Sequence, residues 1–369
     1  MRILVTGANG FVGKNLRATL EQNEEHELFL VTRETTQEEL TEFATKAEFV
    51  FHLAGVNRPV EEQEFETGNV GFTQTLLDTL RQVGSQAPVL VTSSIQAANE
   101  SAYGLSKKAG EELVFTYGAE QDVDVFVYRL PNLFGKWSKP FYNTVIATFS
   151  HQIARGEEIT INNPSVQLNL VYIDDLVAEF LKALKGEATR EGDYCQVPVS
   201  YQVILGHIAD LLKEFKASRD TRLISDLSDD FTRKLYSTYL NFLPEDDFSY
   251  PLITHGDQRG SFTEFVKSPY AGQVSVNISK AGITKGEHWH HTKNEKFLVV
   301  SGQGVIRFRD YFADHVIEYH VSGDKLEVVD IPTGYTHSIV NTGETDMVTI
   351  MWVNEMFDPN NPDTFFLEV

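Results

Sequence analysis

The stretch MRILVTGANGFVGKNL, residues 1–16, decides the fold of the first half of the chain. It begins with the nearly continuous apolar run Arg2–Thr6, typical of a strand buried on both faces, and it ends in a helical pattern. Gly7, Gly10 and Gly13 lie at the turn between them. Glycines there allow a tight turn, an uncovered backbone beside a pyrophosphate, and close packing of the helix on the strand. The stretch therefore predicts a dinucleotide-binding turn, although such glycines can also serve the turn alone.

The same alternation of apolar runs and helical patterns continues along the first two hundred residues. Further runs stand at Leu28–Thr32, Phe49–Leu53, Val89–Thr92 and Val123–Arg129, with helical patterns between them. Strands that alternate with helices in this way form a parallel sheet covered on both faces. We therefore expect an α/β doubly wound parallel sheet in a first domain that spans residues 1–245.

The pattern changes after a segment rich in proline and acidic residues, LPEDDFSYPL at residues 243–252. Short β-branched and aromatic runs follow, such as KFLVVSG and MVTIMWV, and turns such as NTGETD separate them. Runs of this kind at close spacing predict an all-β sandwich or barrel. We place this second domain at residues 246–369.

Composition excludes several classes of protein. A net charge of −22 argues against nucleic acid or an anionic membrane as partner. No apolar run approaches the roughly 20 residues that span a bilayer. The single cysteine, Cys195, excludes a disulfide framework within the chain and fits a reducing compartment. We expect a cytoplasmic protein.

The residue after the second apolar run bears on the choice of cofactor. An acidic residue at that point binds the ribose 2′-hydroxyl of NAD, whereas an arginine accommodates the 2′-phosphate of NADP. Arg33 occupies the position and favours NADPH. Glu34 stands beside it, and a solvated surface arginine is the alternative.

Tyr103 and Lys107 are the strongest catalytic candidates of the first domain. Residues four apart share one face of a helix, so the phenol and the ammonium can meet one substrate. The lysine charge would lower the pKa of the phenol, and Tyr103 could give a proton to a carbonyl oxygen as hydride reaches the carbon. Such a pair also arises by chance, as an aromatic residue beside a solvated lysine. The preceding strand ends in Thr92-Ser93-Ser94, where ligands of parallel sheets bind, and this favours the catalytic interpretation.

The first 180 residues resemble the extended short-chain dehydrogenase/reductase family. The matching motifs are TGANGFVG at 6–13, HLAG at 52–55, NVGFTQTLL at 69–77, TSS at 92–94, YGLSK at 103–107, RLPNLFG at 129–135 and VYIDD at 171–175. The resemblance implies a Rossmann domain in which Tyr103 is the acid, Lys107 contacts the nicotinamide ribose, and Ser94, or alternatively Ser93, holds the carbonyl oxygen. It implies that Asn132 contacts a nucleotide-sugar substrate. The cofactor site that it implies consists of Gly7, Asn9, Gly10, Phe11, Val12, Gly13, Arg33, Leu53, Ala54 and Lys107.

The second domain contains a dense group of metal-ligand residues. His288 and His290 point to the same face of a strand, because side chains repeat every two residues. Glu295 follows, and His337 stands in a later Pro-x-Gly turn region. Three imidazoles and one carboxylate suit Zn²⁺, Fe²⁺ or Mn²⁺. The alternative is a polar barrel interior with hydrogen-bonded histidines.

These four residues fall into the pattern of the cupin superfamily. The first segment fits G(x)₅HxH(x)₄E(x)₆G from Gly282 to Gly302, and the second fits PxGxxHxxxN from Pro332. The glycine usual six residues before that proline is replaced by Leu326. The resemblance implies a small β-barrel with a metal on His288, His290, Glu295 and His337.

A second resemblance, to the nucleotide-4-keto-sugar 3,5-epimerases, starts at Asp257-Gln-Arg259-Gly-Ser-Phe-Thr-Glu264. It implies that Arg259 and Glu264 line a sugar–phosphate site, and that His288 is a catalytic base. We keep His288 as a metal ligand, since one histidine cannot easily do both. The other candidates for the base are His291, Lys293 and Tyr335.

Over its whole length the chain resembles the bifunctional capsular polysaccharide synthesis enzymes of the CapF type. WHHTKNEKFLVVSG at 289–302, PNLFGKW at 131–137, LYSTYL at 235–240, FSYPL at 248–252 and MFDPNNPDTFFLEV at 356–369 carry this match. It implies a UDP-2-acetamido-2,6-dideoxy-4-hexulose substrate, a UDP-L-talosamine-type product, zinc, and a homodimer or larger homo-oligomer. The cupin would epimerise C3 and the reductase would then reduce C4.

Three rival interpretations remain open at the level of the sequence. The cupin could be a non-catalytic, zinc-stabilised module beside a plain reductase. It could hold Fe²⁺ and carry out dioxygen chemistry. The chain could also be a non-enzymatic NADP sensor.

Overall fold

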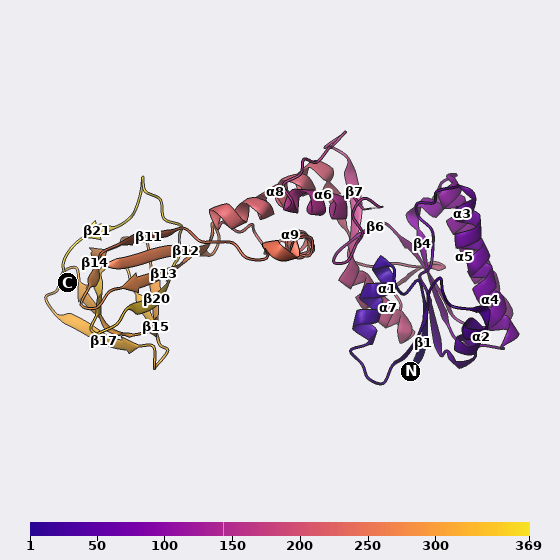
Figure 1. Cartoon of the computed structure of the whole chain (residues 1–369), viewed down its shortest axis with the longest axis horizontal. Helices are drawn as coiled ribbons and strands as arrows, with labels where there is room; N and C mark the ends of the chain where they lie inside the picture. The colour runs from indigo at the N-terminus through magenta and orange to yellow at the C-terminus, as the bar shows by residue number, and fades with distance from the viewer. Residues whose placement is uncertain (143) are drawn as a thin grey trace. The chain divides into compact units, whose positions relative to one another are not determined.

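The computed structural model describes residues 1–142 and 144–369 (Figure 1). The chain divides into two compact units. The α/β unit comprises Met1–Leu212 and Arg233–Pro244, and the all-β unit comprises Lys213–Thr232 and Glu245–Val369. The expected boundary between residues 245 and 246 stays a prediction.

The main sheet of the α/β unit has the strand order β2-β1-β3-β4-β5-β9-β8. Its neighbours pair in parallel up to β9, and β8 pairs antiparallel at the edge. The predicted parallel sheet is confirmed. The strands are β1 (Arg2–Thr6), β2 (Glu27–Val31), β3 (Phe49–His52), β4 (Val89–Ser94), β5 (Val125–Leu130), β8 (Arg190–Glu191) and β9 (Tyr194–Cys195).

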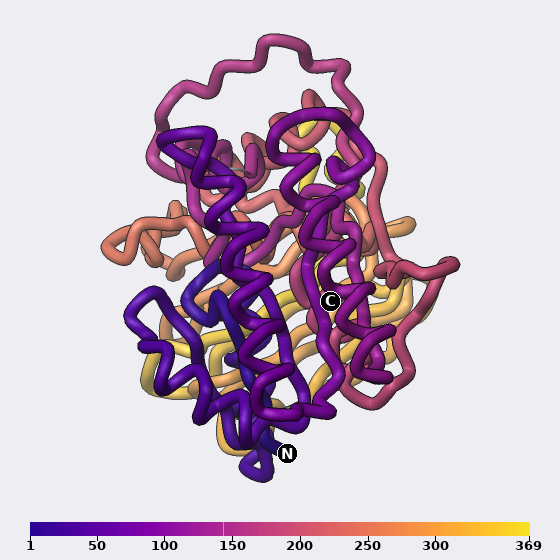
Figure 2. Tube along the Cα trace, turned by 90° about the vertical axis from the view of Figure 1, so that its right-hand side faces the viewer, coloured from indigo at the N-terminus to yellow at the C-terminus, as the bar shows by residue number. Residues whose placement is uncertain are grey.

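Helices cover both faces of this sheet. Successive side chains of a strand point to opposite faces, and an apolar core lies on each face. Ile3 and Val5 of β1 face one core, which α1 and α7 complete, and Leu4 faces the other, which α2, α4 and α5 complete. Figure 1 shows the two helix layers on either side of the sheet, and Figure 2 looks onto the layer that contains α4 and α5. The helices are α1 (Phe11–Leu20), α2 (Gln37–Lys46), α3 (Gln63–Phe65), the π-helix η1 (Glu66–Gly71), α4 (Phe72–Gln82), the 3₁₀ helix η2 (Ile95–Ala98), α5 (Ala102–Gln121) and α7 (Ile173–Leu184).

A smaller sheet in the order β10-β7-β6 follows in the same unit. Its strands are β6 (Asn132–Phe134), β7 (Gln167–Tyr172) and β10 (Tyr201–Ile204). The remaining helices are α6 (Val145–Ala154), α8 (Leu205–Thr221), α9 (Asp230–Leu240) and η3 (Glu245–Asp247). Within the described residues, no helix has the length and apolar character needed to cross a membrane.

The described part of the all-β unit contains two antiparallel sheets, in the orders β11-β12-β13-β20-β15-β18 and β17-β16-β19-β14-β21. Apolar residues of both sheets form one core, for example Phe297 of β15 with Ile306 of β16. The predicted all-β domain is confirmed. Its strands are β11 (Thr254–Asp257), β12 (Gly260–Ser268), β13 (Gly272–Ser279), β14 (Thr284–Trp289), β15 (Glu295–Ser301), β16 (Gln303–Asp310), β17 (Val316–Ser322), β18 (Val328–Ile331), β19 (Tyr335–Asn341), β20 (Met347–Val353) and β21 (Phe365–Phe366).

Candidate functional site

The glycine turn between β1 and α1 admits no side chain at two of its glycines. Gly7 has φ +66°, and a Cβ there would lie 2.7 Å from the backbone nitrogen of Ala54. A Cβ on Gly13 would lie 2.3 Å from the carbonyl oxygen of Gly7. Helix α1 begins after Gly10, which offers no side-chain cap to its first N–H groups. The turn thus combines close strand–helix packing with an uncapped helix N-terminus, which suits a phosphate.

The other predicted cofactor residues lie near the carboxyl ends of the neighbouring strands. Leu53 and Ala54 follow β3, and the Ala54 N–H donates to the Thr6 hydroxyl oxygen at 3.2 Å. Arg33 follows β2 and is exposed, as is Asn9 in the glycine turn. Because β2, β1 and β3 are parallel neighbours, these residues share one edge of the sheet. This is the edge at which ligands of doubly wound sheets bind.

Tyr103 and Lys107 lie on the first turns of α5, and both are half-buried. The Lys107 ammonium donates to the carbonyl oxygen of Thr92 at 3.1 Å. Its nitrogen lies 6.0 Å from the centre of the Tyr103 ring. The helix therefore brings the predicted pair together, beside the end of β4.

The pKa values of this pair differ from the expectation drawn from the sequence. Burial raises the pKa of Tyr103, and the Ser94 side chain offsets only part of that rise. Burial lowers the pKa of Lys107 to about 8, against an opposing effect of Glu111. The prediction that the lysine lowers the pKa of the phenol is wrong for the chain without cofactor, because desolvation of the phenol outweighs any charge effect.

The two candidate serines at the end of β4 have different partners. The Ser93 hydroxyl donates to the buried carboxylate of Glu111 at 2.5 Å. That carboxylate also accepts two hydrogen bonds from Arg129, at 2.9 and 2.6 Å, and one from Tyr194 at 3.2 Å. The Ser94 oxygen accepts the Gln96 N–H at 3.2 Å, and the Ser94 side chain meets the Tyr103 phenol, whose pKa it lowers. This arrangement favours Ser94 over Ser93.

Glu111 was missed by the sequence reasoning, although a signal existed. It lies one helical turn after Lys107, on the same face of α5, where an acidic residue can act on the lysine. Asn132, the predicted substrate residue, lies exposed at the start of β6. No contact places it beside the Tyr103–Lys107 pair within the described residues.

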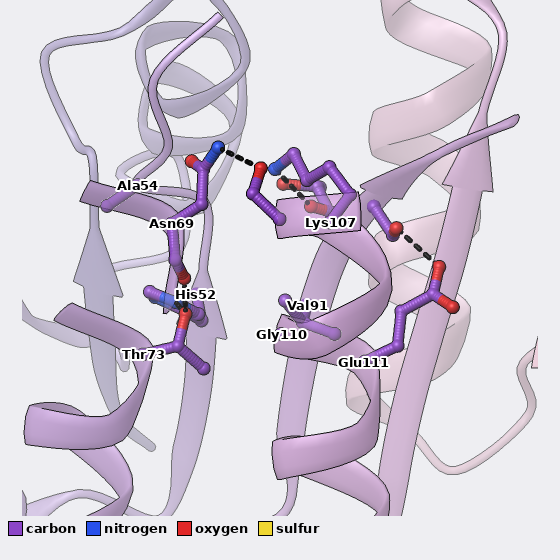
Figure 3. A pocket seen from close by; sticks show the side chains of 11 residues that line it. His52, Ala54, Asn69, Thr73, Val91, Lys107, Gly110 and Glu111 are labelled. Carbon is purple, nitrogen blue, oxygen red and sulfur yellow. Dashed lines mark hydrogen bonds between the residues drawn. The ribbon is translucent and has the colours of Figure 1, made fainter. Parts of the chain in front are cut away.

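A small polar cavity of about 10 Å³ lies beside Lys107, between β3, β4, α4 and α5 (Figure 3). That volume is about the space that one water molecule needs. Its polar lining comes from His52, Asn69, Thr73, Ser93, Ser106, Lys107 and Glu111.

The predicted metal ligands converge in the all-β unit. His288 on β14 stands opposite His337 on β19, and a register shift before His288 aligns the two. One donor atom from each of His288, His290, Glu295 and His337 lies within 4.8 Å of all the others. A Glu295 oxygen lies 3.2 Å from Nε2 of His337 and 3.6 Å from Nε2 of His290.

The donor atoms of this group are those that a metal would need. Nε2 of His290, Nε2 of His337 and the Glu295 oxygen are buried and have no hydrogen-bond partner among the described residues. The Nδ1–H of His290 donates to the carbonyl oxygen of Asp363 at 2.6 Å, which leaves Nε2 with its lone pair.

Burial, then the neighbouring His337 and His290, lower the pKa of His288 to about 4. Burial would raise the pKa of Glu295, yet the adjacent histidines lower it to about 2. Neutral imidazole and ionised carboxylate are the forms that bind Zn²⁺.

A cavity of about 500 Å³ opens onto His288, Glu295 and His337. Its size is that of a small-molecule site. Arg259 lines it, as predicted. Glu264 does not, because it pairs instead with Arg222 at 3.5 Å and with Lys267 at 3.2 Å.

None of the other candidate bases lines this cavity among the described residues. His291 is exposed, Lys293 donates to the carbonyl oxygen of Pro362 at 2.5 Å, and Tyr335 packs against the apolar core. Lys285 on β14 does line the cavity, and the sequence reasoning missed it.

Two family models match the chain. Residues 3–196 match the NAD dependent epimerase/dehydratase family, and residues 255–365 match the polysaccharide biosynthesis C-terminal domain. The chain is 45% identical over 369 residues to a UDP-2-acetamido-2,6-beta-L-arabino-hexul-4-ose reductase of Pseudomonas aeruginosa, covering 100% of this chain and 99% of the relative.

A solved structure is similar over the same length. The capsular polysaccharide assembling protein CapF of Staphylococcus aureus matches with a TM-score of 0.95 and 58% identity, covering 100% of both chains. A structure of CapF with the inhibitor 3-isopropenyl-tropolone matches with a TM-score of 0.89 and 54% identity, again over 100% of both. The chain therefore belongs to the NAD dependent epimerase/dehydratase family and, within it, to the CapF-type proteins that carry a second, all-β domain.

Proposed function

We propose that the chain is a bifunctional nucleotide-sugar enzyme. Its all-β unit, a metal-binding cupin, epimerises C3 of a UDP-2-acetamido-2,6-dideoxy-4-hexulose, and its α/β unit then reduces the C4 ketone with NADPH. The product is a UDP-2-acetamido-2,6-dideoxy-L-talose, a precursor of N-acetyl-L-fucosamine in capsular polysaccharide. The name of the Pseudomonas aeruginosa relative, which is 45% identical over the whole chain, supports the reductase part.

The observation that carries the proposal is the pairing of two sites in one chain. The α/β unit presents Tyr103 and Lys107 beside the end of β4, where parallel sheets bind ligands. The all-β unit presents four convergent donor residues beside a cavity of about 500 Å³. A 4-keto sugar serves both sites, because its C3 proton is acidic and its ketone can be reduced.

In the reduction, NADPH supplies the hydride. Tyr103 is the group that gives a proton to the C4 oxygen, and Ser94, whose side chain meets the Tyr103 phenol, holds that oxygen. Lys107, fixed by the Thr92 carbonyl oxygen, places a positive charge on the same helical face as the phenol. Exposed Arg33, which has no ion pair among the described residues, is suited to the 2′-phosphate of the cofactor.

In the epimerisation, His288, His290, Glu295 and His337 would hold a zinc ion. When bound, that ion supplies a Lewis acid for the ketone oxygen. Arg259 lines the same cavity and is suited to the diphosphate of the substrate. We further propose that the protein works as a homodimer or larger homo-oligomer.

A second candidate function is a monofunctional NADPH-dependent 4-keto-sugar reductase with a non-catalytic, zinc-stabilised cupin. The observation in its favour is that His291, Lys293 and Tyr335 all lie outside the cavity lining. If no residue at the cavity acts as a base, the all-β unit would be a binding module.

Incubation of the full chain with a UDP-4-keto-6-deoxy-HexNAc in D₂O, without NADPH, tests the proposal. We expect deuterium at C3, lost in His290→Ala because the metal site is broken, and retained in Tyr103→Phe. His320→Ala, an exposed histidine on β17, is the matched control and should exchange like the wild type. Addition of NADPH, in preference to NADH, should then yield reduced sugar only when Tyr103 is intact.

If the wild-type chain incorporates no deuterium at C3 but reduces the sugar normally, the monofunctional reductase is the interpretation that remains. Reduction by Tyr103→Phe at the wild-type rate would contradict the role given to Tyr103.

A further inference from the structure

Lys285 is the lysine that faces the cavity of the all-β unit. It stands on β14 and lines the cavity together with His288, Glu295 and His337. Its side-chain nitrogen donates to Oδ1 of Asn277 at 2.7 Å and to the carbonyl oxygen of Ile278 at 2.8 Å. Among the described residues no carboxylate lies within ion-pair distance of it. A half-buried lysine held by two neutral oxygens, without a counter-ion, is unusual for a lysine with only a structural role.

The two hydrogen bonds determine which position of the Lys285 nitrogen remains open for proton transfer. An amine nitrogen has four tetrahedral positions, of which one is taken by carbon and two by the N–H groups that bind Asn277 and Ile278. The fourth position holds a proton in the ammonium form and a lone pair in the neutral form. Burial lowers the pKa of Lys285, with Asp257 opposing and Arg259 adding to that effect. The neutral form, which can accept a proton, is therefore more accessible than in a fully solvated lysine.

The other titratable residues of the cavity are committed elsewhere, except for His255, an exposed residue of β11. His288, Glu295 and His337 belong to the ligand group. Asp257 is held by Arg259, whose Nε and terminal nitrogen donate to one of its oxygens at 3.0 and 2.6 Å. Hydrogen bonds from Arg259 lower the pKa of Asp257, which makes this carboxylate a poor base.

We propose that Lys285 is the catalytic base of the C3 epimerisation, an assignment that rests on the proposed function. The neutral amine removes the C3 proton: the C–H bond breaks, an N–H bond forms, and the electron pair moves toward the C4 ketone to give an enolate. Solvent water then protonates C3 on its opposite face, and the ammonium returns its proton to the resulting hydroxide. The acceptor oxygens of Asn277 and Ile278 hold the nitrogen in place throughout, so little reorganisation accompanies the transfer.

The test is deuterium incorporation at C3 by the zinc-loaded full chain in D₂O, without NADPH. Lys285→Met should lower the exchange rate by about 100-fold or more, the usual contribution of a general base. Lys280→Met is the matched control, because Lys280 is an exposed lysine of the same unit that pairs with Asp346. It should exchange at the wild-type rate.

Chemical rescue separates a base from a residue that only supports the cavity. Lys285→Cys treated with 2-bromoethylamine regains an amine at nearly the lysine length, and exchange should return. Treatment with iodoacetamide should not restore it. The natural Cys195 is buried, and the wild-type chain treated in the same way controls for its modification.

Each outcome bears on one claim. A wild-type chain that incorporates no deuterium overturns the proposed epimerisation itself. A wild-type chain that exchanges, with Lys285→Met exchanging equally fast, overturns the base and leaves the epimerisation standing. Loss of exchange in Lys285→Met that aminoethylation of Lys285→Cys does not restore also overturns Lys285 as the base.

Discussion

At the scale of single residues, His52 shows how the α/β unit holds a polar group in its interior. The side chain is 2% exposed. Its Nδ1 and Nε2 lie 2.8 Å from the hydroxyl oxygens of Thr6 and Thr73, and the Thr73 hydroxyl donates to the carbonyl oxygen of Asn69 at 2.6 Å. The Thr6 oxygen accepts the Ala54 N–H, so its proton is free for Nδ1. Every donor and acceptor of this hydrogen-bond network has a partner when the imidazole is neutral and carries its proton on Nε2.

The neutral state of His52 makes stability depend on pH. Burial, with a smaller effect of the nearby Lys107 charge, lowers the pKa of His52 to about 3, below its ordinary value of 6.5. A depressed pKa means that stability is complete above pH 6.5 and is lost as the pH falls toward 3. Between pH 7 and pH 5 the wild-type chain should lose about 2 kcal/mol of unfolding free energy relative to His52→Asn.

Equilibrium urea unfolding of both chains at the two pH values checks this. The titrating groups that the two chains share contribute equally to both, so their contributions cancel in the difference between the two unfolding free energies. The exposed His207 provides the control, since His207→Asn should follow the wild-type pH profile. Parallel profiles for wild type and His52→Asn would contradict the neutral state of His52.

At the scale of elements, the segment Pro362–Val369 packs around the metal-ligand strand β14. Strand β21 pairs with it at His288 and Trp289, and the Leu367 N–H donates to the carbonyl oxygen of Glu287 at 3.0 Å. The Asp363 carboxylate accepts the backbone N–H groups of residues 291–293 at 3.0, 2.9 and 2.9 Å. The Asp363 carbonyl oxygen fixes the ring of His290. One short segment therefore orients a predicted metal ligand and the turn that follows it.

We expect Asp363→Asn to weaken zinc binding by about 10- to 100-fold, because the turn that carries His290 loses its carboxylate acceptor. Competition with a chromogenic zinc chelator measures the affinity directly, without reference to activity. Asp358→Asn, just before that segment, is the matched control, as Asp358 is exposed and its carboxylate accepts only the Asn360 N–H among the described residues. Equal zinc affinity in both variants would contradict the orienting role of Asp363.

At the scale of the whole molecule, the two units present separate ligand sites, and each ligand should stabilise the unit that binds it. A ligand at about a thousand times its dissociation constant adds about 4 kcal/mol to the folded state. Removal of zinc by a chelator should lower the unfolding temperature of the all-β unit, and NADPH should raise that of the α/β unit.

Tryptophan fluorescence can separate the two effects. Trp137 belongs to the α/β unit, and Trp289 and Trp352 belong to the all-β unit. In Trp137→Phe the thermal transition should move to lower temperature on chelation and respond little to NADPH. An equal response to both treatments would contradict two independently liganded units.

Much of the fold and of both candidate sites could be predicted from the sequence, because the signals are local. The apolar run of β1 and the glycines after it stand within sixteen residues, and the close approach of Gly13 to the Gly7 carbonyl oxygen is a local contact. Tyr103 and Lys107 meet because they stand four apart on a helix. His288 and His290 share a face because they stand two apart at the end of a strand, and the structure brings them to Glu295 and His337.

Other features were decided by the tertiary structure alone, because they depend on burial and on partners distant in sequence. Burial raises the pKa of Tyr103, and no local pattern reports burial. Glu111 accepts the Ser93 hydroxyl, whereas the Ser94 side chain meets the Tyr103 phenol. Arg222 and Lys267 draw Glu264 into ion pairs, and a register shift in β14 between Gly286 and His288 lets Lys285 and His288 line one cavity. The sequence by itself determined which chemical groups the protein carries, whereas packing between distant strands decided which of them face a ligand.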